Sequence, residues 1–362
     1  MITISIIVAI LVFMIIIVVH EWGHFIAARA CGVYVEEFAV GMGPKLLGRK
    51  SKKGTLYAWR LFPIGGFCRM RGEEEAVDEE DSFSNATVGR RMIIVAAGPL
   101  MNFVLALVLM MVLTCSYGYI DTRIESVDPD YPAAEAGIEA GDRIYAINGH
   151  RTRIYSKFSY EMSLNQGEEI SLTVKKPDGN LETVTFSPLF DEELNRYRLG
   201  FTVKSNGGSL AEIVRNEGVS RLLPSIGNML HESFWSMCFD VELVVRSFVQ
   251  LITGQVSTRE VAGPIGIVNV IGESYREGIR ESVVAALSNV ASLVILLSVN
   301  LGVLNLFPIP ALDGSRLVFL LIEKIRGKKI NEKVENWIYT IGFILLMGLM
   351  ILIAINDIHN LL

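Results

Sequence analysis

The sequence predicts a polytopic α-helical membrane protein with four transmembrane helices, a membrane-associated β-hairpin and one inserted α+β domain. Of its 362 residues, 51% are hydrophobic and only 20% are charged, which is typical of integral membrane proteins. Four uncharged runs reach the roughly 20 residues that a membrane-spanning helix requires. They are Met1–Val19, which continues through the residues after it, Met92–Ile120, Ser282–Leu312 and Asn336–Asn356. A charged, turn-rich stretch from Asp121 onwards separates the second run from the third.

Changes in composition divide the chain into four parts. They are residues 1–120, the first half of a membrane core; 121–206, the inserted domain; 207–281, a linker; and 282–362, the second half of the core. The linker contains a further apolar stretch, Asn228–Gly254, which charged residues interrupt. Two of them, Glu242 and Arg246, are spaced at i and i+4 and can pair on one helix face. We therefore expect an amphipathic helix lying on the membrane surface rather than a fifth span.

Lysine and arginine counts predict which ends of the spans face the cytoplasm. Eleven of these residues lie in 29–91 and six in 313–335, whereas none precedes the first span or follows residue 356. Because cytoplasmic flanks of spans are enriched in Lys and Arg, we expect both termini and the inserted domain to be extracytoplasmic. The end of the first span, near His20, then lies toward the cytoplasmic leaflet.

The most informative motif is His20-Glu21-Trp22-Gly23-His24, which continues the first uncharged run. On a helix, residues at i and i+4 share one face, so both imidazoles can bind one Zn²⁺ while the glutamate acts as a general base. A single ionisable residue at a helix end could instead extend to the lipid headgroups. Three such residues within five positions of an apolar helix are costly and favour a functional site. A cleaved signal peptide is a poor alternative, because no positive charge precedes the apolar run, which is also too long.

A catalytic zinc site needs a third protein ligand, and Asp313 is the candidate. The third span ends in a segment with Pro308 and Pro310, which remove backbone donors and break the helix. Irregular backbone at membrane depth is tolerated where it lines a cavity. The predicted topology brings Asp313 to a depth similar to that of the two histidines. Asp313 followed by Gly314 could also begin an ordinary cytoplasmic turn, but the matching depth favours a ligand.

Together these motifs resemble the site-2-type intramembrane zinc metalloprotease family, most closely its bacterial RseP/RasP branch with a single PDZ domain. The resemblance runs the length of the chain. It includes three further glycine-containing motifs, Phe62–Phe67, Ala97–Phe103 and Gly263–Gly266. It implies a Zn²⁺ site whose metal ligands and water-activating residue are His20, His24, Asp313 and Glu21.

The same resemblance implies a substrate class and a location. Substrates would be single-span transmembrane proteins, cut near the cytoplasmic side in regulated intramembrane proteolysis. Relatives suggest anti-sigma factors or signal-peptide remnants. An upstream protease of the site-1 type would first shorten the substrate outside, as a functional rather than a physical partner. The implied location is the plasma membrane of a bacterial cell.

Several residues are candidates for contact with the substrate. Residues 55–70 are rich in aromatic and branched side chains around Gly65 and Gly66, and they predict a β-hairpin or a looped strand after the motif helix. A transmembrane substrate must unwind before cleavage, and an exposed strand edge could bind its extended backbone. The alternative is a small cytoplasmic hairpin without substrate contact. Asn102 and Asn305 are amides within apolar spans, where they either contact the substrate or hold helices together.

The inserted domain resembles a bacterial PDZ domain in residues 128–149, which match its helix–turn–strand core. Further strands are expected at 169–175, 182–187 and 197–203. PDZ domains bind extended peptides at a sheet edge. Relatives often carry a glycine-containing strand before the core, whereas this chain has Asp121-Thr-Arg-Ile124 there. Two functions of this domain therefore remain as alternatives: it recruits substrates, or it excludes bulky ones.

Other features narrow the functional classes. The net charge is −6 without a basic patch, so nucleic acid is not an expected partner. The four cysteines form no C-x-x-C pair, which argues against a thiolate metal site. The acidic run Glu73–Asp81 is interpreted as a solvated loop. The alternative to an enzyme is a catalytically silent scaffold that gathers partners through the inserted domain. An intact Glu21 beside three candidate ligands favours the enzyme.

Overall fold

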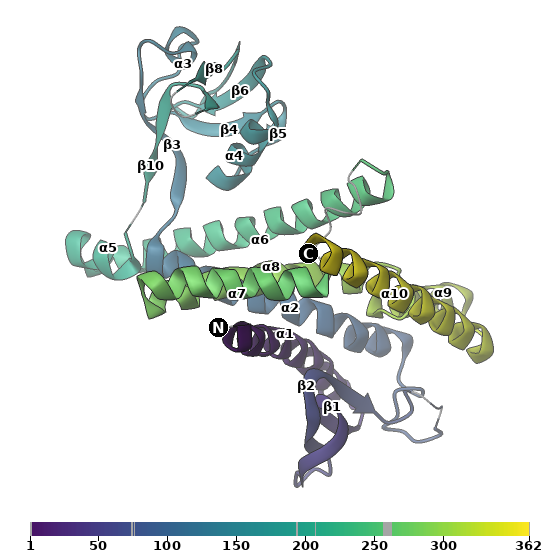
Figure 1. Cartoon of the computed structure of the whole chain (residues 1–362). Coiled ribbons are helices and arrows are strands. Elements are labelled where there is room, and N and C mark those ends of the chain that lie inside the picture. The colour runs from purple at the N-terminus through teal and green to yellow at the C-terminus, as the bar shows by residue number, and fades with distance from the viewer. Residues whose placement is uncertain are drawn as a thin grey trace. The chain divides into compact units, whose positions relative to one another are not determined.

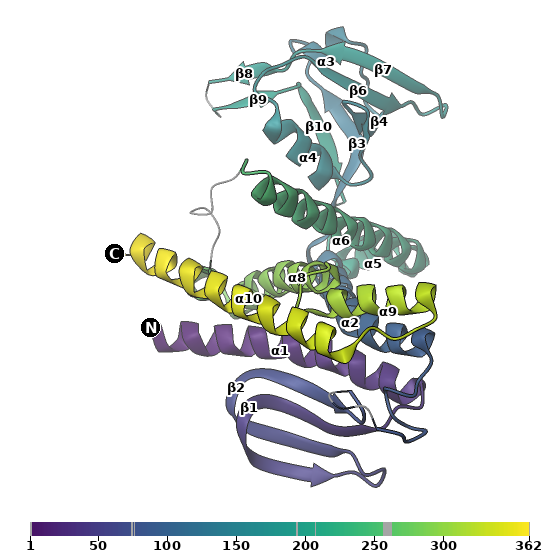
Figure 2. The same ribbon diagram turned by 90° about the vertical axis from the view of Figure 1, so that its right-hand side faces the viewer.

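The computed structural model describes residues 2–73, 75, 77–192, 195–206, 208–255 and 263–361. The chain forms two compact units, one made of Met1–Leu109 with Asp240–Leu362 and the other of Met110–Phe239. Figures 1 and 2 show a helical unit and a unit that contains the larger β-sheet. Two long helices, α2 and α6, each begin in one unit and end in the other.

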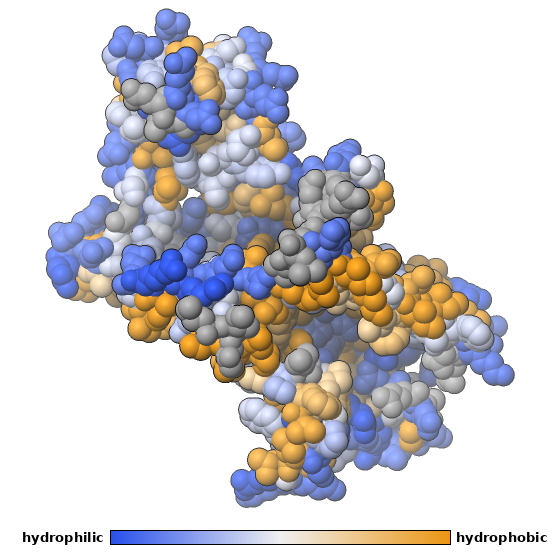
Figure 3. Space-filling model, in the orientation of Figure 1, coloured by the Kyte–Doolittle hydropathy of each residue, from blue (hydrophilic) through white to orange (hydrophobic). Residues whose placement is uncertain are grey.

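Four helices are long and apolar enough to cross a membrane, as the sequence predicts. They are α1 (Ile2–Ala30), α2 (Val88–Tyr117), α8 (Val283–Leu306) and α10 (Glu332–Leu361). The third uncharged run extends to Leu312, and its helix ends at Leu306, before the two prolines that were expected to break it. Pro308 and Pro310 follow, and neither can donate a backbone hydrogen bond to a continuing helix. Figure 3 shows apolar side chains gathered over α10 and its neighbours in this unit.

The core of the first unit lies where α1, α7 (Pro264–Glu281) and α8 pack together. Ala9, Val12 and Ile16 of α1 are buried against Ile271 of α7 and Val294 of α8. Small residues bring the backbones close: a Cβ at Gly272 would lie 2.5 Å from the Cβ of Ser5. Close backbone approach through small residues is how helices associate in lipid, where burial of apolar surface gives little drive.

The Gly263–Gly266 motif holds the end of α10 to the start of α7. The Asp357 carboxylate accepts hydrogen bonds from the backbone N–H groups of Gly263, Ile265 and Gly266, at 3.0, 3.1 and 2.9 Å. Unpaired N–H groups at a helix start are satisfied in this way, and the anion also complements the helix dipole. A Cβ at Gly263 would lie 2.5 Å from the same carboxylate, which explains the glycine.

Residues 55–70, predicted as a β-hairpin or a looped strand, form one long, bent strand. β2 (Leu56–Met70) pairs antiparallel with β1 (Val35–Lys50), a strand that the sequence analysis did not predict. Both strands bend, so that residues 35–40 pair with 66–70 on one side and with 56–60 on the other. Residues 56–60 also pair with 45–50. The free edges are therefore 66–70 and 45–50, and Figures 1 and 2 show the sheet next to α1.

The second unit contains the inserted α+β domain that was predicted to be PDZ-like. Its sheet has the order β10-β3-β4-β6-β7, with β5 paired to β4. The strands are β3 (Ile120–Val127), β4 (Arg143–Ile147), β5 (His150–Arg151), β6 (Ile170–Lys175), β7 (Leu181–Phe186) and β10 (Phe201–Ser205). Two helices, α3 (Pro132–Glu135) and α4 (Tyr155–Leu164), accompany the sheet. Ile124, Ile147, Phe158 and Leu172 are buried in its core.

The strand predicted at 197–203 is broken into β9 (Arg196–Arg198) and β10, and β9 pairs with β8 (Leu189–Asp191). The break is at Leu199-Gly200, where Gly200 has φ +90° and a Cβ would lie 1.8 Å from the Cβ of Tyr131. The chain therefore has a glycine just before a strand at this point, after the core. That strand is β10, which is an edge strand of the sheet.

The linker is helical, as expected, but its helix is longer. The described part of residues 207–281 contains α5 (Leu210–Glu217), a short 3₁₀ turn at Val219–Arg221, α6 (Leu222–Ile252) and α7. α7 was not expected, and it packs in the core of the first unit instead of linking two parts. A capping box between Ser209 and Glu212 begins α5. α6 starts six residues before the predicted Asn228 and is not among the four candidate spans. α9 (Asp313–Arg326) completes the described elements and joins the region after α8 to α10.

Candidate metal centre

His20 and His24 project from one face of α1. Their ring centroids are 4.9 Å apart, as i and i+4 residues on a helix should be. Gly23, between them in sequence, brings α1 against α2: a Cβ there would lie 2.3 Å from the carbonyl oxygen of Ala97. The spacing of the motif thus determines which residues face the site, and Gly23 lets the neighbouring helix approach.

Asp313 lies close to the histidines and directly follows a non-helical segment that begins after α8. This segment covers residues 307–312, and Asp313 is the first residue of α9. Ala311 has φ +75°, a left-handed conformation that is strained for a residue with a side chain and that concentrates at functional sites. Gly314 is required by packing, since a Cβ there would lie 2.1 Å from the carbonyl oxygen of Phe307.

Three ligand atoms form a nearly equilateral triangle. The Nε2 atoms of His20 and His24 are 3.2 Å apart, and they lie 3.1 and 3.3 Å from Oδ2 of Asp313. A tetrahedral Zn²⁺ with bonds of about 2.0–2.1 Å would space its ligand atoms about 3.3–3.4 Å apart. Two nitrogens and one carboxylate oxygen are also a usual catalytic zinc donor set, which leaves one position for water or substrate. The residues therefore fit a catalytic zinc ion.

Neighbouring groups favour the ionised form of the Asp313 carboxyl group, which is the form that binds a cation. Burial alone would raise the pKa of Asp313, but hydrogen bonds from His20 and His24 outweigh it and hold the pKa below its ordinary value. Near the same carboxylate, Arg316 forms an ion pair with Glu73, the first residue of the acidic run. The interpretation of that run as a solvated loop is therefore incomplete, since Glu73 lines the metal cavity.

Glu21 lies between the imidazoles and the sheet. Its Oε2 accepts a hydrogen bond of 3.0 Å from the backbone N–H of Cys68 in β2. The cavity that contains these groups has a volume of about 460 Å³. Its lining includes the segment Phe67–Met70, the free edge of the sheet. A general base, a metal ligand set and an unpaired strand edge thus share one cavity.

One face of α2 completes the centre. The carbonyl oxygen of Ile94 lies 2.9 Å from Nδ1 of His24, and the amide nitrogen of Asn102 lies 3.3 Å from Nδ1 of His20. Between them, Gly98 makes room for the rings, because a Cβ would lie 2.3 Å from Nε2 of His24. Gly98 lies in the Ala97–Phe103 motif, but no role was predicted for it from the sequence. The spacing of Ile94, Gly98 and Asn102, at four-residue intervals, places all three on one helix face and could have indicated that role.

The structure separates the residues proposed for substrate contact. Asn305, near the end of α8, lines the metal cavity and is 8% exposed. Gly65 and Gly66 precede the lining segment in β2 but are not part of the lining. Gly66 nevertheless packs close to Glu21, whose Cγ would be 3.7 Å from a Cβ at this position. Asn102 is fully buried behind His20 and does not line the cavity.

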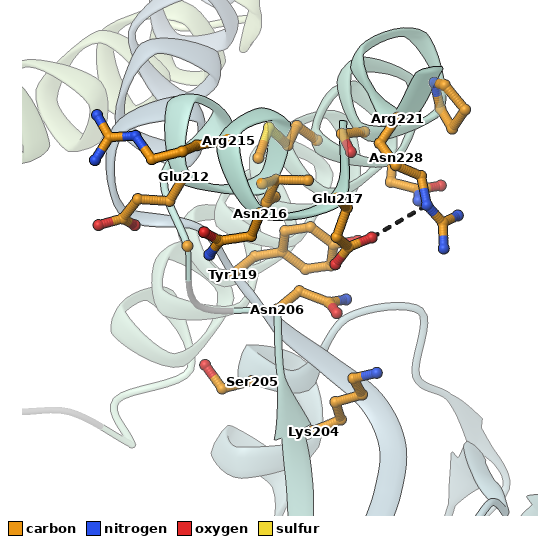
Figure 4. A pocket seen from close by; sticks show the side chains of 15 residues that line it. Tyr119, Lys204, Ser205, Asn206, Glu212, Arg215, Asn216, Glu217, Arg221 and Asn228 are labelled. Atoms are coloured by element: carbon orange, nitrogen blue, oxygen red, sulfur yellow. Dashed lines mark ion pairs between the residues drawn. The ribbon is translucent and has the colours of Figure 1, made fainter. Parts of the chain in front are cut away.

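Larger hollows occur in the second unit but lack this chemistry. The one in Figure 4 has a volume of about 740 Å³ and is lined by residues from β10, α5 and α6. Its charged groups include a pair between Glu217 and Arg221, 3.1 Å apart and both more than half exposed. Among the described residues, the sole group of three potential ligands close enough for one metal is His20, His24 and Asp313.

The fold and the site define a class: a membrane protein with the donor set and base of a metal-dependent hydrolase. The comparisons identify the family. The chain matches Peptidase family M50 over residues 8–349 and belongs to that family. Relatives are named as zinc metalloproteases, so the protein is a zinc-dependent metalloprotease of the membrane.

Three similar proteins illustrate the match. A Clostridium acetobutylicum protein named "Putative zinc metalloprotease" is 36% identical over 98% of this chain and 97% of its own length. "Zinc metalloprotease RasP" of Oceanobacillus iheyensis is 27% identical, with 97% and 98% covered. The PDZ domain of the SdrC-like protein from Listeria monocytogenes aligns with 24% of this chain and 88% of its own, at 25% identity and a TM-score of 0.21.

Proposed function

We propose that this protease cleaves single-span transmembrane proteins near the cytoplasmic side of the plasma membrane, in regulated intramembrane proteolysis. The observation that carries the proposal is the triangle of His20, His24 and Asp313 at the end of an apolar helix, with Glu21 beside it. Soluble substrates would not need a catalytic centre on membrane-spanning helices. Anti-sigma factors and signal-peptide remnants, previously shortened by a protease of the site-1 type, are the substrate classes that we propose.

Each residue of the centre has a separate task in this proposal. His20, His24 and Asp313 hold Zn²⁺, which when bound supplies Lewis acidity for the scissile carbonyl and lowers the pKa of water. Glu21 takes the proton from the attacking water and passes it to the leaving amine. The amide of Asn305, which lines the same cavity, is placed to contact the substrate backbone.

The strand edge at residues 66–70 is the proposed binding site for the unwound substrate. Cys68 directs its N–H away from β1 and toward Glu21, and the N–H of Met70 is likewise directed out, toward Glu73 at 3.4 Å. Alternate residues of an edge strand direct both N–H and C=O outward. An extended substrate segment can therefore pair with this edge beside the metal site. Pairing would stabilise the unwound form of the substrate, whose peptide bonds are no longer protected by helical hydrogen bonds.

We further propose that the PDZ-like domain recruits the substrate. A groove of about 740 Å³ runs along the edge strand β10 and the helix α4. Its lining combines apolar side chains, such as Phe158, Met162 and Phe201, with the Leu199-Gly200 turn. A first extracytoplasmic cut would create a new peptide end on the substrate. Such an end could pair with the backbone of β10 and place its side chains in the apolar pocket. Exclusion of bulky substrates is the competing function of the same domain.

The membrane orientation follows from charge. Lys and Arg are concentrated in 29–91 and 313–335, so these segments are proposed to face the cytoplasm. With them go the end of α1 that carries His20 and His24 and the start of α9 that carries Asp313. Both termini and the PDZ-like domain would then be extracytoplasmic.

The test uses purified protein in detergent and a panel of single-span substrates. Glu21→Gln should lower kcat by about 10²–10⁴-fold, because the general base is lost, while bound zinc stays at the wild-type level. Glu80→Gln changes an exposed carboxylate outside the cavity and serves as the matched control. Mass spectrometry of the fragments locates the cut.

Three results would contradict the proposal. Full activity of Glu21→Gln would remove the base from the mechanism. Cleavage confined to soluble peptides, or cuts on the extracytoplasmic side of every membrane substrate, would reject the substrate class and the orientation.

A further inference from the structure

The two histidines of the metal centre have different neighbours behind their rings. Nδ1 of His24 lies 2.9 Å from the carbonyl oxygen of Ile94, which is a hydrogen-bond acceptor. Nδ1 of His20 lies 3.3 Å from Nδ2 of Asn102, which is a donor. The Nε2 atoms of both rings face Asp313. The two rings thus have the same orientation toward the metal but opposite partners on the far side.

Metal binding requires the same tautomer of both rings. A neutral imidazole that binds a cation through Nε2 carries its hydrogen on Nδ1, so Nδ1 must face an acceptor. The carbonyl of Ile94 meets this requirement for His24. For His20, the donor Nδ2 would oppose the Nδ1 hydrogen. The oxygen and nitrogen of an asparagine amide have nearly the same shape, so a half-turn of the amide places Oδ1 against Nδ1 without moving other atoms.

In the present orientation of the Asn102 amide, one buried polar atom also lacks a hydrogen-bond partner within the described part of the chain. Oδ1 of Asn102 is buried and has no partner among the described residues. Either orientation of the amide leaves one end without a partner, so the metal-binding tautomer of His20 decides between them. The rotated amide is the orientation in which Nε2 of His20 directs a lone pair at the metal.

We propose that Asn102 is a positioning residue for the zinc centre: its rotated side-chain oxygen accepts the Nδ1 hydrogen of His20 and holds that ring in the metal-binding tautomer. Asn102 is fully buried, so the substrate does not reach it. Its backbone carbonyl accepts a 2.9 Å hydrogen bond from Ser298 of α8, the helix that leads to Asp313. Asn102 therefore links α1, α2 and α8. The inference rests on the proposed zinc ligands and deepens that proposal.

The test measures zinc binding and the imidazole tautomer in the full-length protein in detergent. Asn102→Leu removes the acceptor at similar volume and should weaken Zn²⁺ binding about 10–100-fold in competition with a chelator. Asn102→Asp keeps an acceptor oxygen and should stay within about threefold of wild type, since carboxylate–histidine–zinc arrangements are common. Ser298→Ala removes a buried hydrogen bond at the same helix crossing and should also leave zinc affinity within about threefold. In ¹⁵N-histidine spectra, zinc-loaded wild type should carry its hydrogen on Nδ1 of His20.

Each outcome decides one question. An Asn102→Leu protein with wild-type zinc affinity would overturn the inference, as would an Asn102→Asp protein that is folded but binds zinc as weakly as the leucine variant. If the aspartate variant fails to fold, the wild-type spectrum still decides, because a hydrogen on Nε2 of His20 in the zinc form contradicts the proposed tautomer. A wild-type protein that binds no zinc would instead reject the proposed ligands.

Discussion

The candidate metal centre and the proposed peptide groove beside β10 are built from different parts of the chain. The centre is made of side chains from α1 and from the start of α9, and α2 packs directly against them. The groove is made of backbone at an edge strand, β10, with apolar side chains beside it. Each belongs to a different compact unit.

This difference predicts different tolerances to substitution. A zinc site needs its ligand atoms within a few tenths of an ångström, so the helices behind them must pack without a gap. A strand edge offers repeated N–H and C=O groups whatever the side chains are, and it selects ligands through a few pockets. Substitutions near the metal centre should therefore abolish activity, whereas substitutions in the groove should adjust it.

The largest effect is expected from Gly98→Ala. The new Cβ would lie 2.3 Å from Nε2 of His24 and 2.8 Å from Nε2 of His20, so the rings or α2 must move. We expect loss of bound zinc, measured by metal analysis, together with loss of cleavage. Gly89→Ala in the same helix is the matched control, because its Cβ would meet no atom within 4 Å. The control should be neutral, or stabilise α2 by up to about 1 kcal/mol. A Gly98→Ala protein with full zinc content would show that the packing behind the ligands is looser than proposed.

A smaller effect is expected from Cys68→Pro, which tests the strand edge next to the metal. Proline removes the outward N–H of residue 68 and leaves the pairing of β2 with β1 in place. We expect kcat/KM for a membrane substrate to fall about 10–100-fold, because the hydrogen bonds that the N–H of residue 68 donates are lost. Bound zinc should be retained. Cys68→Ala keeps the N–H and should stay near wild type. Equal losses in both variants would assign the effect to the thiol and reject backbone pairing.

The smallest effect is expected in the groove. Ser159→Trp places a bulky ring in the groove between α4 and β10. Ser156→Trp makes the same change at an exposed position of α4 outside the groove. If the domain recruits substrates, Ser159→Trp should raise KM several-fold, by the roughly 1–1.5 kcal/mol of a lost apolar contact, with kcat and the control unchanged. If the domain excludes bulky substrates, Ser159→Trp should leave KM unaltered, and deletion of the domain should broaden the substrate range.

Local pattern was sufficient to predict the spans and the ligand pair on α1. A run of about twenty apolar residues is long enough to cross a membrane as a helix and is rarely found otherwise. The i, i+4 spacing places two side chains on one helix face whatever surrounds them. The role of Asp313 required a topological argument from charge, which the structure supports by bringing it within 3.3 Å of both imidazoles.

The strand β1 could not be predicted in the same way. Its second half, from Met42 to Lys50, is exposed throughout and rich in glycine and charge, so no alternation marks it as a strand. It is a strand because β2 pairs with it. The free edge at 66–70 follows from that pairing alone, whereas residues 56–60, the aromatic-rich start of β2, are paired on both sides.

The sequence by itself thus determined the membrane class, the HEWGH face of α1 and the presence of an inserted α+β domain, because each depends on residues close together in the chain. The tertiary structure decided what surrounds the metal ligands. Gly98 and Asn102 have roles only because α2 packs on α1, and Gly200 begins an edge strand only because β10 pairs with β3. Residues 70 or more positions apart define these sites, and no local periodicity records which helix face or strand edge will meet them.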